Sequence, residues 1–315
     1  MRKTGWIGLF LASGFLLVCA AVLIARPYAR AERLVEDTLR RRAPAGTKVG
    51  SIDVSFPSNI ELTNVSIPVR VNDGQSLLPF GKLSGRLSVL PFLQGRVHAE
   101  MNGDIFGGTL WLAIRLDALP RMSSEDSQFV ALEARARNLD IATLCNFFQA
   151  PIVASGRCDA DAEAELDERS LTDSTGWTLV KGEQIDIPRI ELDMVSLPPN
   201  RQVGLTARLS AEDGTVYIER FELVGTAYDV SGKGRIWLSD PLEDSPIDLS
   251  LATTLKEDVS ITDDRIAGEG AEHVVSTLIA TRSKLFLKVA GTAEHPEVRL
   301  DAASSLSSIL EQLGR

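Results

Sequence analysis

The sequence predicts a mostly β protein: an N-terminal transmembrane helix followed by an elongated, twisted antiparallel sheet with a few short helices. Apolar and polar residues alternate over much of the chain, which is the period of half-buried strands. Val, Ile, Leu and Thr recur in short runs, glycine is plentiful and aromatic residues make up only 6%. One stretch of twenty uncharged residues stands near the N-terminus and predicts the transmembrane helix.

Length and charge exclude some classes of protein. A chain of 315 residues can form one large domain or two modest ones, with ample material for a core. The formal net charge is −10, from 43 acidic and 33 basic residues. A general nucleic-acid binder would carry a basic surface, so we expect no nucleic acid among the partners.

The uncharged stretch, residues 6–25, follows a short basic tip. Twenty helical residues span about 30 Å, the thickness of the hydrocarbon core. A cleaved signal peptide has a shorter apolar region, of about 7–15 residues, and a lipoprotein needs a small residue where Val18 precedes Cys19. An uncleaved anchor is therefore favoured over these and over a buried soluble helix. The residues predicted to form the membrane anchor are Trp6, Ile7, Leu9, Phe10, Leu11, Phe15, Leu16, Leu17, Val22, Leu23 and Ile24.

The orientation of this anchor is set by two opposing signals. Counted literally, the six arginines between residues 26 and 42 outnumber Arg2 and Lys3, which would leave the body in the cytoplasm. Long domains translocate largely regardless of charge, however, and a short basic tip before an apolar run is how export signals begin. We expect the body on the exported side of the membrane.

Three segments follow from this plan: the tip and anchor (1–25), a stalk helix and linker (26–46), and a β-rich domain (47–315) with a possible sub-boundary near 123–128. The stalk is charged at helical spacing and ends before Pro44 and Gly46. From Val49 onward, apolar and polar residues alternate with a period of two, as in β-strands. Strands are predicted over 49–56, 59–69, 82–90, 95–103, 108–116 and 129–141, again from 152 through 225, and over 284–291; helices are predicted over 141–149, 270–282 and 305–314.

The segment GTAYDVSGKGRIWL, residues 225–238, contains a lysine between two glycines and raises the question of a phosphate-binding loop. Such a loop has the spacing GxxxxGK[ST], but Ala227 stands where its first glycine should be and Gly234 where its Ser or Thr should be. From Tyr228 on, apolar residues instead fall mainly on even positions, so one strand runs through the segment, and its glycines indicate a bulge or the close approach of another backbone or a ligand. The candidate inner-face residues are Tyr228, Val230, Gly232, Gly234, Ile236 and Leu238.

The acidic run 157–168 raises the possibility of a calcium site, but the carboxylates from Asp159 to Asp167 all fall on odd positions, as on a strand with one solvated face. It lacks the loop glycine of an EF-hand. A helix is the alternative for this run, because Ala, Glu and Leu are good helix formers. His98, His273 and His295 lie far apart, and no GxSxG, HExxH or CxxC occurs. We therefore expect no catalytic residue, no metal and no cofactor.

Cys145 and Cys158 bracket the predicted helix at 141–149 and its exit. In an oxidising compartment they could form a disulfide that closes a short loop. Two buried free thiols are an equally good interpretation of the sequence.

Two stretches resemble AsmA-like envelope proteins and, more closely, the type II secretion system protein N family. In 220–255 a glycine-ended strand at Gly225 leads to a strand at 234–238, then to a turn at Asp240-Pro241 and a further strand. The terminal 288–300 resembles the closing G-T-x-x-x-P-x-hydrophobic strand pair of that family. It matches at Gly291, Thr292, Pro296 and Val298.

The resemblance implies a single-pass protein of the bacterial inner membrane, with an AsmA-like, groove-forming sheet in the periplasm and no enzymatic activity. It implies an accessory component of a type II protein secretion system that acts through contacts with other secretion proteins. The alternative is an AsmA-like protein whose apolar groove binds phospholipid or transfers it between the envelope membranes. Strand length and an unpaired apolar face would discriminate between the two.

Overall fold

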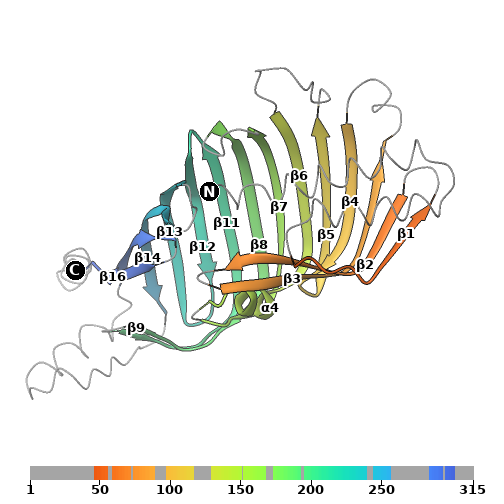
Figure 1. Cartoon of the computed structure of the whole chain (residues 1–315). Coiled ribbons are helices and arrows are strands. Elements are labelled where there is room, and N and C mark those ends of the chain that lie inside the picture. Colours follow the sequence, from red (N-terminus) through yellow and green to blue (C-terminus); the bar gives the residue numbers. More distant parts are fainter. Residues whose placement is uncertain are drawn as a thin grey trace, which may run out of the picture.

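The computed structural model of the chain is shown in Figure 1. The residues it describes are 46–55, 59–71, 74–88, 97–116, 129–150, 152–167, 173–192, 195–239, 244–256, 284–293 and 295–301. The predicted anchor, the stalk helix and the helices expected at 270–282 and 305–314 lie outside these residues. Within them, no helix has the length and apolar character to cross a membrane.

Fourteen strands of the described residues pair into one antiparallel sheet, which confirms the predicted mostly β, antiparallel fold. Neighbours in the sheet follow the order of the chain, apart from a two-stranded hairpin between β8 and β11. β5 and β6, on either side of 117–128, pair directly with one another. The sheet strands are β1 (Ser51–Ser55), β2 (Asn59–Val71), β3 (Gly74–Leu87), β4 (Val97–Ile105), β5 (Gly108–Leu116), β6 (Phe129–Asp140), β7 (Ser155–Asp167), β8 (Thr175–Ile187), β11 (Asn200–Glu212), β12 (Thr215–Val224), β13 (Tyr228–Trp237), β14 (Pro246–Leu255), β15 (Lys284–Thr292) and β16 (Pro296–Leu300); the hairpin is β9 (Ile190–Leu192) and β10 (Val195–Leu197).

Alternation of side chains gives this sheet an apolar face, which we call the inner face, and a polar outer face. On β13, Tyr228 and Val230 are buried, while Lys233 and Arg235 are exposed. The register extends this division to the neighbouring strands, because Val230 lies opposite Leu223 on β12 and Thr253 on β14. The backbone runs straight through the SGKG segment as a strand, as predicted.

The acidic run folds as β7, so the strand interpretation is confirmed and the helix alternative is wrong. Cys158 is buried, and Asp159, Glu163 and Glu165 are exposed on the outer face. Asp167 departs from the pattern because it is buried at the end of the strand.

The short helix predicted at 141–149 is present as α4 (Ile141–Phe147). It begins at Asp140, whose Oδ1 accepts hydrogen bonds from the backbone N–H and the hydroxyl of Thr143, both at 2.7 Å. These bonds favour the ionised carboxylate and lower the pKa of Asp140. The N-cap therefore fixes where the chain leaves β6 and turns into the helix.

Three strands bend at the end of the sheet where α4 lies, and we call this the closed end. Asn138, Gln184 and Gln202 have left-handed backbones, with φ of 58°, 54° and 51°. The pairing register shifts around Asn138 and Gln202. Bulges of this kind bend a strand and increase its twist, so the strands curve together at this end.

β3 is longer than predicted, since it begins at Gly74 rather than at residue 82. Its first half pairs with the second half of β2, beyond Ile105, where β4 ends. This two-stranded ribbon crosses the foot of the sheet near α4 and β8 in Figure 1. Pro68 and Pro79 fit there because, among the described residues, β1 and β4 do not reach this part of the ribbon, and its β2 edge makes only the isolated bridge between Lys48 and Ser66.

Candidate functional site

The closed end of the inner face is covered by three elements. α4 packs over β6–β8 through Ile141, Leu144 and Phe147, against a buried cluster that contains Leu139 and Cys158. Leu78 of β3 joins the same cluster, although two strands, β4 and β5, separate β3 from β6. The sheet therefore curls over its apolar face at this end.

The β9–β10 hairpin covers the neighbouring strands at the same end. Leu197 is buried, and Ile190 packs beside it, against Tyr228, Leu255 and Leu285 of β13–β15. Together with α4 and the β2–β3 ribbon, this hairpin places a second layer on the closed end only, within the part of the chain that the structure describes.

The remainder of the inner face is a broad apolar surface whose side chains are half-buried. From β5 to β16 the described inner-facing positions carry no charged side chain, and only Thr178, Tyr228 and Thr253 carry a hydroxyl. At the C-terminal edge Val298 is 46% exposed. Representative half-buried positions away from the closed end are Ala162, Leu209, Val216, Ile218, Ile236, Leu249 and Leu287.

The predicted inner-face residues Tyr228, Val230, Gly232, Gly234 and Ile236 do share this face. Leu238 follows the end of β13 and is half-buried, and its N–H donates to the carbonyl of Gly214. The close approach expected at the two glycines comes from β14. A Cβ on Gly234 would lie 2.3 Å from the carbonyl oxygen of Asp248, and one on Gly232 would lie 2.4 Å from Cδ2 of Leu251.

Among the described residues of the inner face, two hydroxyls are buried without a hydrogen-bond partner, those of Tyr228 and Thr253. Each side chain is 1% exposed. Burial raises the pKa of the Tyr228 phenol, so the group stays protonated at neutral pH. Together with Thr178, these two residues carry the hydroxyl groups of the described inner-facing positions from β5 to β16.

Cys145 on α4 and Cys158 on β7 are both free thiols in this structure, half-buried and buried respectively. Burial raises the pKa of Cys158, and the charges of Asp159 and Cys145 raise it further. A high pKa keeps the thiol protonated and unreactive. A disulfide between the two under oxidising conditions stays a prediction.

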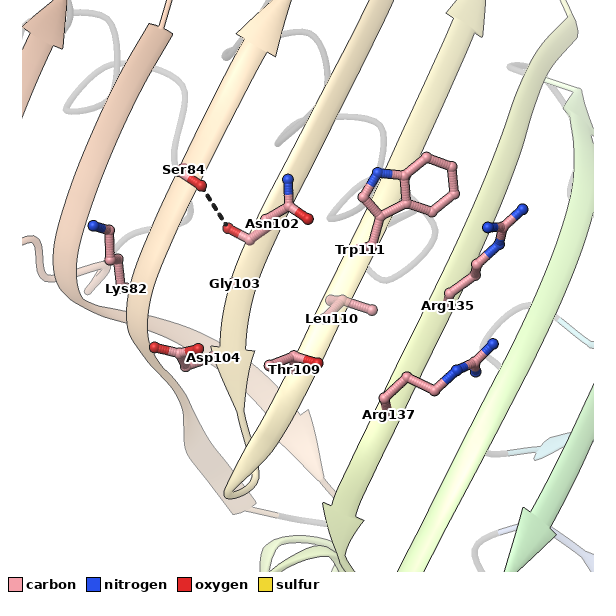
Figure 2. Close-up of a pocket in the computed structure, with 10 residues that line it drawn as sticks. All are labelled: Lys82, Ser84, Asn102, Gly103, Asp104, Thr109, Leu110, Trp111, Arg135 and Arg137. Atoms are coloured by element: carbon pink, nitrogen blue, oxygen red, sulfur yellow. Dashed lines mark hydrogen bonds between the residues drawn. The ribbon is translucent and has the colours of Figure 1, made fainter.

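The outer face is polar and carries a shallow hollow over β3–β6, with a volume of about 570 Å³. Figure 2 shows Trp111 projecting from this face, with Arg135 and Arg137 on the adjacent strand and Lys82 and Asp104 at the other side. The guanidinium of Arg135 lies 4.9 Å from the centre of the Trp111 ring. Arg137 pairs with Asp161, and Lys82 pairs with Glu61 at 2.8 Å.

Sequence reasoning missed the aromatic residues of this outer face. Trp177, Tyr217 and Trp237 are 41%, 43% and 36% exposed. The sequence could have predicted the exposure of Trp237, because it has an odd number like Lys233 and Arg235 and so lies on the polar face of the same strand. Large aromatic residues on a solvated face are unusual enough to count as candidate binding residues.

Comparisons with known proteins identify no family model, curated protein or solved structure that matches this chain. Within the described ranges, no group of three or more His, Cys, Asp or Glu side chains could hold a metal ion. The arrangement that stands out is therefore a surface, the half-buried apolar inner face.

Proposed function

We propose that the protein binds the acyl chains of phospholipids along its inner face, as expected for an AsmA-like groove. The observation that carries the proposal is the uncharged inner face from β5 to β16, which the described elements cover only at the closed end. Each buried methylene contributes about 0.8 kcal/mol, so contact with roughly eight of them would contribute about 6 kcal/mol.

The chemistry of this face favours hydrocarbon over an extended peptide. A peptide backbone laid on it would bury N–H and C=O groups, which need hydrogen-bond partners. Among the described positions of the inner face from β5 to β16, hydroxyls occur only at Thr178, Tyr228 and Thr253, and the last two are fully buried. An acyl chain has no such groups to satisfy.

The dimensions also suit lipid. A strand of ten residues, the length of β13 and β14, spans about 33 Å. One acyl chain spans about half of the 30 Å hydrocarbon core of a bilayer. The uncovered part of the inner face is therefore long enough for an acyl chain lying along the strands.

A benzophenone side chain in place of Leu249, on the inner face, is expected to cross-link to phospholipid when the full-length protein is irradiated in cell membranes. The matched control replaces Ser250, the next residue and exposed on the outer face, and is expected to yield no lipid adduct. Mass spectrometry of the purified protein identifies the adducts. Peptide adducts at 249, or equal lipid adducts at both positions, would contradict acyl-chain binding at this face.

A role in type II secretion is the second candidate. It is supported by how the segments that carry the resemblance fold: 225–238 forms a turn and β13, and Gly291 and Pro296 pair at the turn between β15 and β16. In this proposal residues 6–25 anchor the chain in the bacterial inner membrane, and the body contacts other secretion proteins in the periplasm.

Deletion of the gene is expected to leave secreted enzymes in the periplasm if the protein is a secretion component. The measurement compares the activity of a secreted enzyme in the medium and in the periplasm, with the gene restored as the control. Unchanged secretion, together with an altered phospholipid distribution between the two membranes, would contradict the role in secretion and support phospholipid binding.

A further inference from the structure

The outer face carries an oblique line of aromatic side chains that acyl-chain binding on the other face does not use. It consists of the three tryptophans of the described residues, Trp111, Trp177 and Trp237, together with Tyr217; we call it the aromatic stripe. Trp177 lies opposite Ser210 of β11, and Ser210 lies opposite Tyr217 of β12. Two strand spacings therefore separate Trp177 from Tyr217, about 10 Å.

The other two members extend the stripe in both directions. Tyr217 lies opposite Arg235, and Trp237 follows Arg235 by two residues on the same face. Trp111 lies opposite Arg135 of β6, and the same cross-strand row continues through Asp161 of β7 to Leu179 of β8. Trp177 is two residues from Leu179 on the same strand and the same face. From β5 to β13 the stripe crosses seven strands, or about 30 Å.

Neighbouring charged groups hold these rings in place. The guanidiniums of Arg135 and Arg235 lie 4.9 Å and 4.8 Å from the centres of the Trp111 and Trp237 rings. The indole N–H of Trp177 donates to Glu163 at 3.3 Å. The three tryptophan rings are therefore oriented before any ligand arrives, which lowers the entropy lost on binding.

From this pattern we infer that the outer face binds a linear, uncharged glycan, with its sugar rings stacked on the aromatic stripe. Successive aromatic side chains in a line form a stacking platform for a polymer with flat units, as in proteins that bind single-stranded nucleic acids. A protein interface instead gathers its aromatic residues in one central cluster.

The charged residues beside the stripe indicate whether the bound polymer is charged or uncharged. A nucleic acid needs a groove of unpaired cations. Here two of the arginines next to the stripe are paired with carboxylates, Arg135 with Glu133 at 2.6 Å and Arg208 with Glu219 at 3.0 Å, and Arg235 lies against the Trp237 ring. The neutral balance fits a polymer without charge, and the paired groups supply both donors and acceptors for sugar hydroxyls. The carboxylates also make an anionic membrane surface an unfavourable partner.

The hollow in Figure 2 lies at one end of this stripe, beside Trp111. Its rim carries donors on Arg137 and Lys82, a carboxylate on Asp104 and the amide of Asn102. A sugar unit stacked on Trp111 would place its hydroxyls over this rim. The hollow and the stripe therefore point to the same class of ligand.

The test is calorimetric titration of the full chain, in a detergent without a sugar headgroup, with β-linked hexasaccharides of glucose, mannose and N-acetylglucosamine. At least one is expected to bind, and Trp177→Ala or Tyr217→Ala should weaken that binding by at least about tenfold, as for a lost stacking contact. Trp177→Phe, which keeps a ring, should weaken it less. Phe286→Ala is the matched control, because Phe286 is an aromatic residue of the outer face on β15, away from the stripe.

Absence of binding for all three sugars at millimolar concentration would overturn the inference. So would affinity that survives both alanine variants, or a loss in those variants of binding to phospholipid vesicles or of self-association without any sugar binding. The lipid adduct at position 249 is independent of these outcomes, since it reports on the opposite face of the sheet.

Discussion

Replacement of Asn200 by leucine is expected to lower the free energy of unfolding by about 3 kcal/mol. The side chain of Asn200 is fully buried at the start of β11. Its Nδ2 donates to the carbonyl of Tyr228 at 2.8 Å, and its Oδ1 accepts from the N–H of Ala227 at 2.9 Å. Leucine would leave both backbone groups buried and unsatisfied, at a cost of about 1–3 kcal/mol each.

Thermal melting of the full-length protein, followed by circular dichroism, measures this effect. For a domain of this size, 3 kcal/mol corresponds to a fall of about 6–12 °C in Tm. Asn102→Leu is the control, because Asn102 is exposed on the outer face of β4. Equal melting temperatures for the two variants would show that Asn200 does not hold the β12–β13 turn in place.

The strands of this protein were predictable because one face of the sheet is apolar and the other is solvated. Alternation of period two follows directly from that difference, and β7 and β13 show it over most of their length. The parity of β13 also sufficed to predict which residues share the inner face. What alternation specifies is the local backbone and the face of each residue.

The bends at the closed end were not predictable from local sequence. Asn138, Gln184 and Gln202 adopt positive φ, and glutamine has no strong preference for that region. Their conformation is supported by distant residues: the N–H of Asn138 donates to Asp159 at 2.7 Å, and that of Gln202 donates to Asp186 at 3.2 Å. Only the paired register brings these groups together, so the curvature of the sheet depends on tertiary contacts.

The ribbon of β2 and β3 was missed in part for a related reason. Pro68 and Pro79 argue against a central strand, and the prediction accordingly ended one strand at residue 69 and began the next at 82. Pro79 is tolerated because the ribbon extends beyond β4, and Pro68 because it extends beyond the residues of β2 that pair with β1. Position in the sheet, which sequence does not reveal, decided whether a proline could be accommodated.

The inner face was predictable as an apolar surface, but its partial cover was not. α4 was expected, yet nothing in its sequence showed that it would pack on β6–β8 rather than elsewhere. The β9–β10 hairpin interrupts one long predicted strand region, and its Leu197 becomes part of the core under β13. The candidate groove therefore emerges from which elements fold back over the sheet.

Substitution of Gly234 by valine is expected to destabilise the protein by about 3 kcal/mol, at the upper end of overpacking effects. The new Cβ would lie 2.3 Å from the carbonyl oxygen of Asp248 and 2.7 Å from Cα of Leu249. Both atoms belong to the backbone of β14, so two strands must separate to admit the side chain. At Gly232 the nearest atom is instead the end of the flexible Leu251 side chain, and Gly232→Val should cost less.

Lys233→Val is the matched control, since Lys233 lies between the two glycines on the exposed outer face. A surface change of this kind stays within about 0.5 kcal/mol. Chemical denaturation should therefore give the lowest free energy of unfolding for Gly234→Val, a higher one for Gly232→Val and the highest of the three for Lys233→Val. If the segment were a phosphate-binding loop, ATP would raise the Tm of the unsubstituted protein. Lys233→Val would then abolish this rise, and the glycine variants would keep it. The strand interpretation requires that ATP leave the melting temperature unchanged, because the backbone N–H groups of 231–235 face the neighbouring strands instead of a ligand.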